Sequence, residues 1–133
     1  MCAIFSNPVL YILIVNIIGL TWAVRSWKKT IREKWMNSLR DAGAELIGAA
    51  ELIYGIAADD KSLSTAQASF IAKEQKLLLL FAHDNEEKKI FKTNSENLRK
   101  AAEGRVTKTY RDELDSFSNG VSNRVLKEWQ AIK

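Results

Sequence analysis

The side chains that most often perform catalysis are scarce in this sequence of 133 residues. His83 is the only histidine and Cys2 the only cysteine, so a zinc site with several His ligands and a Cys–His nucleophile pair both lack partners. The glycines follow neither the dinucleotide fingerprint nor the P-loop. Carboxylates such as Glu45 and Glu51 stand singly, at spacings typical of a solvated helix face. These patterns predict a protein that is not an enzyme and uses no cofactor or metal ion.

One polar side chain, that of Asn16, lies inside the longest apolar stretch of the sequence. Asn16 is an amide near the centre of an uncharged apolar run from Pro8 to Val24. Inside a bilayer such a group usually faces another helix or water. Because the chain has one such run, the partner is expected to be a second chain or the lumen of a pore. The alternative is an amide that bonds to its own backbone.

The apolar run has the length of a membrane anchor. Its 17 residues span about 25 Å as a helix, and the preceding Ala3, Ile4 and Phe5 extend it toward the roughly 30 Å of a hydrocarbon core. Trp22 and Trp27 suit the interface. A cleaved signal peptide would need a basic segment before the run, and none is present. Residues 1–24 are therefore predicted to be a single-pass transmembrane anchor.

All of the net charge of +4 lies in residues 25–34, directly after the anchor. Arg25, Lys28 and Lys29 lead this basic juxtamembrane segment, and residues 35–133 are neutral in sum. The positive-inside rule then places the N-terminus outside and the rest of the chain in the cytoplasm. In a pore, these three bases would ring the cytoplasmic mouth.

A heptad-like seam follows the basic segment. Its apolar residues alternate at spacings of four and three without an intervening proline, which predicts one helix from about Pro8 to Ala57. We expect the seam to join chains in a homo-oligomer, with packing inside one chain as the alternative. The seam consists of Trp35, Leu39, Ala42, Leu46, Ala49, Ile53 and Ile56.

The remaining sequence predicts three more helices and no strand. Ser64 and Gln67 form a capping box for a helix reaching about Ala82, after a loop at Asp59–Ser62. Asp84 with Glu87 caps the next helix, which ends near Gly104. The last helix runs from about Tyr110 to Ile132, either continuous or broken in two at Asn119–Gly120. The fold class is therefore all-α: a transmembrane helix that continues into a bundle of about four helices, residues 35–133.

A second group of bases lies in the third predicted helix and just after it. It is a candidate surface for a phosphate-bearing ligand or nucleic acid, with a solvated helix face as the alternative. Its members are Lys88, Lys92, Arg99, Lys100, Arg105 and Lys108.

The segment after the anchor resembles a pattern found in small bacterial membrane proteins of unknown function. These carry an Arg-x-x-Trp-Ile-x-x-Leu-Arg-like segment, matched here by Arg32, Trp35, Leu39 and Arg40, with Met36 in place of Ile. Some proteins of similar layout are membrane accessories of antiviral defence systems that assemble into rings. The resemblance implies a helical protein of the bacterial inner membrane.

Together, these features predict a self-associating effector that forms a pore or perturbs the membrane in antiphage defence. Its trigger would be a cytosolic protein, a nucleotide or a nucleic acid. The alternative is a membrane-tethered adaptor that recruits a cytosolic partner and conducts nothing.

Overall fold

The computed structural model describes residues 8–56 and 61–132. Every regular element in this part of the chain is an α-helix, which confirms the predicted all-α class. Cys2 and the first half of the predicted loop at Asp59–Ser62 lie outside the described residues. The helices are α2 (Pro8–Gly55), α3 (Ser62–Leu79), α4 (Asn85–Gly104) and α5 (Thr107–Ile132).

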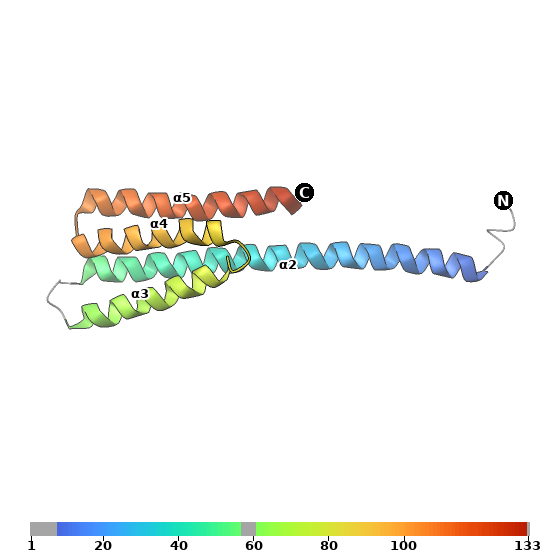
Figure 1. The fold of residues 1–133 in the computed structure, drawn as a ribbon, viewed down its shortest axis with the longest axis horizontal. Coiled ribbons are helices and arrows are strands. Elements are labelled where there is room, and N and C mark those ends of the chain that lie inside the picture. The colour runs from blue at the N-terminus through green and yellow to red at the C-terminus, as the bar shows by residue number, and fades with distance from the viewer. Residues whose placement is uncertain (1–7, 57–60, 133) are drawn as a thin grey trace.

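Successive helices run antiparallel and form an up-down bundle (Figure 1). The first of them, α2, has 48 residues and is about 72 Å long. Its C-terminal half packs against α3, α4 and α5, whereas its N-terminal half extends alone beyond the bundle. The C-terminal end of α5 lies beside the middle of α2 (Figure 1). One helix is thus both the projecting segment and a wall of the core.

The core forms where the apolar stripes of the four helices meet. Residues 39, 46 and 53 of α2 are completely buried, and α3 and α5 contribute Phe70 and Phe117. Burying a large apolar side chain stabilises a fold by about 1.5–3 kcal/mol. The bundle therefore has a core of its own, built entirely from one chain.

A glycine lets α2 and α5 approach closely. Gly43 is buried, and a Cβ added to it would lie 3.3 Å from both methyl groups of Val121 on α5. Ala42, Ala49 and Ala50 on the same helix are also buried. The pair Ala44 and Gly48 points to the exposed side instead. The small residues of α2 thus serve packing inside the chain at four positions.

The predicted start of the second helix is wrong. The helix begins at Ser62, two residues before Ser64, and its N-cap residue Lys61 makes no side-chain capping hydrogen bond. The Gln67 amide instead donates to Glu103 Oε1 on α4 at 3.0 Å. A tertiary partner therefore takes the side chain that the capping box assigned to the local backbone.

The predicted cap of the third helix is confirmed. Asp84 Oδ1 accepts hydrogen bonds from the backbone N–H groups of Glu86 and Glu87, each at 3.1 Å. The helix ends at Gly104 as expected, but the left-handed residue is the next one, Arg105, with φ 58°.

The last helix, α5, is continuous through Asn119–Gly120, where the sequence left a break open. Gly120 lowers the intrinsic stability of the helix, but Phe117 and Val121 on either side of it are buried in the core. Packing therefore holds the helix through this position.

Candidate membrane-proximal site

The projecting half of α2 has the properties of a membrane span. It contains a window of mean hydropathy 1.8 with none of its residues buried by the rest of the chain. Large apolar side chains such as Ile17, Leu20 and Trp22 are more than 60% exposed. Asn16 is exposed in the same stretch. The chain thus has one N-terminal helix long and apolar enough to cross a bilayer.

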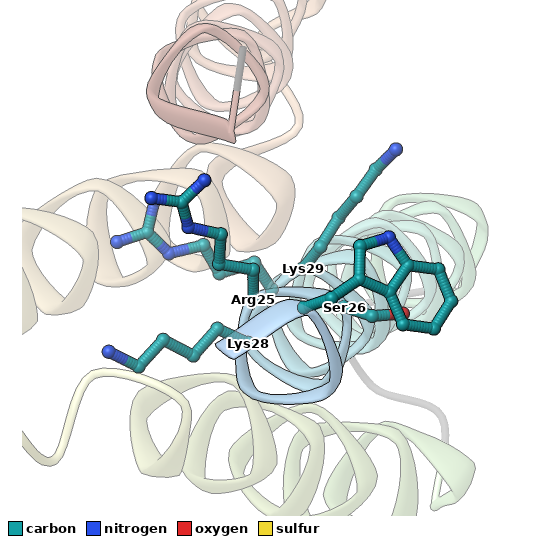
Figure 2. Close-up of a pocket in the computed structure, with 6 residues that line it drawn as sticks. Arg25, Ser26, Lys28 and Lys29 are labelled. Carbon is teal, nitrogen blue, oxygen red and sulfur yellow. The ribbon is translucent and has the colours of Figure 1, made fainter. Parts of the chain in front are cut away.

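A basic collar follows the apolar stretch on the same helix. We use this name for Arg25, Lys28, Lys29 and Arg32, whose spacing of three, four and seven residues places them on one side of α2. Together with Trp22 and Ser26 they border a space of about 580 Å³ (Figure 2). Because all six residues belong to one helix, this space is an open groove between extended side chains.

Arg32 joins the collar to the bundle. Its guanidinium NH1 donates to the backbone oxygen of Ala131 at 3.2 Å, and its Nε lies 3.6 Å from a carboxylate oxygen of Glu128. Both partners belong to the last turns of α5. The end of the bundle nearer the projecting half of α2 therefore meets α2 at residue 32.

A cluster around Trp35 ties the other helices to α2 just beyond the collar. The Trp35 indole N–H donates to the backbone oxygen of Leu80 at 2.9 Å, and its ring meets Phe81 edge-on at 5.5 Å between centroids. The guanidinium carbon of Arg124 lies 4.7 Å from the Trp35 ring centroid. A cation over a tryptophan face is attracted by the ring quadrupole. Trp35 thus contacts the turn after α3 and helix α5 at once.

Arg124 also gathers two carboxylates from different helices. Its Nε lies 2.8 Å from Glu87 on α4, and its NH1 donates to Glu128 on α5 at 3.0 Å. Burial would lower the pKa of Arg124, but these two carboxylates outweigh it and raise the pKa above its ordinary value. The charged guanidinium is therefore the form that holds α2, α4 and α5 together. We call Trp35, Arg124, Glu87 and Glu128 the clamp.

The seam residues lie inside the chain's own bundle. Five of them are buried and the two at its ends, Trp35 and Ile56, are half-buried against the same core. A second chain could contact the buried positions only after displacing α3, α4 or α5. Packing within the chain, the alternative left open by the sequence, is what the described residues show for Leu39, Ala42, Leu46, Ala49 and Ile53.

The second group of bases does not form one pocket. Arg99 is engaged with Glu103 at 3.8 Å, and Arg105 forms the left-handed turn between α4 and α5. A surface hollow of about 240 Å³ at that turn is lined by a single member, Lys100. Lys92, Lys100, Arg105 and Lys108 are exposed and Lys88 is half-buried. These positions are spread along α4 and the start of α5.

Sequence reasoning missed the clamp, because its members are far apart along the chain. Only the spacing of Arg124 and Glu128, four residues apart on one helix, signals a pair in advance. It also missed a buried contact in which the Ser95 hydroxyl donates to Glu74 Oε2 at 2.6 Å. His83 is exposed at the turn after α3, with its ring 6.2 Å from that of Trp35.

Across residues 8–56 and 61–132, no three His, Cys, Asp or Glu side chains lie close enough together to hold a metal ion. No protein family, curated protein or solved structure matches this chain. The functional argument therefore rests on the anchor, the collar, the clamp and the bundle.

Proposed function

We propose that this protein is a membrane-tethered helical adaptor of the bacterial inner membrane. Its bundle lies on the cytoplasmic side and recruits a cytosolic partner. The observation that carries the proposal is the double role of α2, which projects an apolar anchor and also forms a wall of a complete one-chain core. Such a helix holds the bundle at a set distance from the bilayer.

The clamp supports this function because it makes the junction stiff. Trp35 of α2 is held by Leu80, Phe81 and Arg124 immediately after the collar. A flexible linker would let a tethered domain sample a large volume. A continuous helix fastened at Trp35 presents the same surface of the bundle to the cytoplasm at all times.

A self-associating effector is the second candidate, and Asn16 favours it. Its side chain is exposed in the middle of the projecting apolar helix, where a partner amide on another chain or the water of a pore would satisfy it. Because the seam is buried inside the bundle, the chains of a self-associating effector would have to associate through their anchor helices. The sequence analysis predicts a role in antiphage defence for the effector, and we propose the same role for the adaptor.

An anchor exchange separates the two functions. Residues 8–24 are replaced by an unrelated Leu/Ala membrane helix of equal length, while every residue from Arg25 onward is kept. In cells that carry the natural neighbouring genes, the adaptor should still protect against phage and the membrane potential should stay intact. The effector should lose protection, and its wild type should depolarise the membrane during infection.

A point variant refines the effector test. Asn16→Leu should suppress depolarisation if the amide faces a pore, whereas Ile17→Leu at the adjacent apolar position should leave it unchanged. Depolarisation by the wild type would refute the adaptor. An anchor-exchanged protein that no longer protects, without any depolarisation by the wild type, would also count against it.

A further inference from the structure

Three residues of the basic collar lie on one side of α2, and this side leads to the core. Four residues after Arg32 the same side carries Met36, and seven residues after it Leu39, both of which are buried by the bundle. Figure 2 shows Arg25 and Lys28 extending from α2 to the same side. Arg25, Lys28 and Arg32 therefore lie on the side of α2 that carries the bundle. Lys29 extends in a different direction, away from Arg25 and Lys28 (Figure 2).

Three of the four cations have no ion-pair partner in the described part of the chain. Arg32 is paired with Glu128 and Ala131, whereas no carboxylate lies within ion-pair distance of Arg25, Lys28 or Lys29. All three side chains are exposed. Three positive charges gathered within about two helical turns repel one another unless an anion lies among them. The collar is thus an electrostatic site for a negative group.

The position of the collar along α2 indicates which kind of anion it would contact. Arg25 directly follows Val24, the last residue of the apolar run. The headgroup layer of a bilayer is roughly 5–8 Å thick on each side of the hydrocarbon core, and residues 25–29 cover about 6 Å of helix. If Val24 marks the end of the hydrocarbon core, the three cations lie at the depth of the lipid phosphates. Arg32, which is held by the end of α5, then borders the groove on the cytoplasmic side.

We propose that this groove binds the headgroup of an anionic phospholipid, such as phosphatidylglycerol. The Arg25 guanidinium can take two phosphate oxygens, and Lys28 and Lys29 add point charges beside it. Trp22 borders the same groove on the side nearer the membrane and packs against the glycerol and upper acyl chain. This inference rests on the proposed membrane attachment and adds lipid selectivity to it.

The test uses the full chain in phosphatidylcholine vesicles that contain a minority of phosphatidylglycerol. Brominated acyl chains are placed on one lipid or the other at equal mole fraction, and quenching of tryptophan fluorescence reports which lipid lies beside Trp22 and Trp27. At physiological salt, brominated phosphatidylglycerol should quench the wild type more strongly than brominated phosphatidylcholine.

The variant Arg25→Gln/Lys28→Gln/Lys29→Gln should lose this preference. One cation near an anionic surface strengthens binding about fivefold, so removing three should lower the preference by more than about tenfold. The matched control, Lys61→Gln/Lys89→Gln/Arg111→Gln, removes the same charge from exposed bases of the bundle and should keep it. Quenching by brominated phosphatidylcholine should be equal in all three proteins, which shows that each is inserted.

Three results would overturn the lipid site: equal quenching of the wild type by both lipids, equal loss of preference in the control variant, or abolition of the preference by inorganic phosphate. The last would assign the groove to a soluble anion. A wild-type chain that fails to float with the vesicles would refute the membrane attachment itself. Failure of the lipid site and failure of the proposed function are therefore distinguishable.

Discussion

At the scale of single residues, Tyr110 and Arg105 are in unfavourable environments: the first has a buried polar group and the second a left-handed backbone. The Tyr110 hydroxyl is buried without a well-aligned hydrogen-bond partner among the described residues, and its ring stacks on Tyr54 at 4.3 Å between centroids. Arg105 adopts a left-handed backbone that favours glycine. Both lie at the end of the bundle away from the anchor, where α4 turns into α5. Each provides a test of the packing there.

Tyr110→Phe should leave the free energy of unfolding unchanged or higher at neutral pH, because the lost hydroxyl satisfies no well-aligned partner. Burial raises the pKa of Tyr110 above its ordinary value, and the nearby Glu51 carboxylate raises it further. The folded state therefore holds this proton more tightly than the unfolded state, and the wild type should lose stability as pH rises above about 10.

The phenylalanine variant should lack this part of the alkaline decline in denaturant titrations followed by circular dichroism. Tyr54→Phe is the control: it removes a hydroxyl that bonds to Thr107 at 2.9 Å, and should cost about 1 kcal/mol at neutral pH, where Tyr110→Phe should cost nothing. Equal pH slopes in the wild type and Tyr110→Phe would contradict the argument.

Arg105→Gly should raise the free energy of unfolding by about 0.5–1 kcal/mol. The Cβ of an L-residue is strained at positive φ, and the relief exceeds the extra freedom that glycine brings to the unfolded chain. Arg105→Ala removes the same charge but keeps the Cβ, so it should bring no gain. Thermal unfolding of both variants in detergent compares them directly, and equal stability of the two would argue against strain at this turn.

At the scale of helices, the contact between α2 and α5 depends on a residue without a side chain. Gly43 and Gly48 both lie inside α2, but only Gly43 meets another helix; a Cβ at Gly48 would contact nothing within 4 Å. Glycine inside a helix costs about 1 kcal/mol against alanine. The two glycines therefore differ in what an added methyl group would do.

Gly48→Ala should stabilise the protein by about 1 kcal/mol, the full gain in helix propensity. Gly43→Ala should gain less or lose stability, because its Cβ would press on Val121 at 3.3 Å. In a Val121→Ala background the space opens, and Gly43→Ala should approach the gain seen at Gly48. A double-mutant cycle measured by denaturant unfolding gives the coupling energy between Gly43→Ala and Val121→Ala. A coupling energy of zero would show that α5 moves away from the added methyl group at no cost in stability.

At the scale of the whole molecule, the bundle and the projecting half of α2 have separate surfaces. The core closes within one chain, and the exposed apolar area is concentrated on the projecting half of α2. Contact with lipid or with other chains is therefore expected first along the anchor. We expect the C-terminus to lie in the cytoplasm. A C-terminal fusion to a reporter that works only in the cytoplasm should therefore be active, and a fusion to alkaline phosphatase should be inactive. Alkaline phosphatase activity would show that the orientation is the reverse of the one proposed.

Lysine substitutions on α2 distinguish a core seam from an interface between chains. Leu46 is fully buried and Leu52 is 54% exposed on the same helix. Leu46→Lys should unfold the bundle, because burying an unpaired ammonium costs several kcal/mol, whereas Leu52→Lys should change stability by less than about 0.5 kcal/mol. Circular dichroism and mass measurement in detergent report the two effects. A folded Leu46→Lys protein of lower mass would show that the seam joins chains.

The amino-acid pattern alone was sufficient for the long helix α2, for its apolar N-terminal half and for the cap at Asp84. Each of these depends on residues a few positions apart, and helical periodicity decides which side chains share a side. The partner of the seam, the tertiary bond of Gln67 and the clamp around Arg124 needed the folded chain. Burial of an apolar helix stripe is equally favourable whether the same chain or another chain covers it, so the pattern does not identify the partner. Residues such as Trp35 and Arg124 come into contact only when the helices pack. Local spacing therefore predicts the elements, and the tertiary structure decides what covers them.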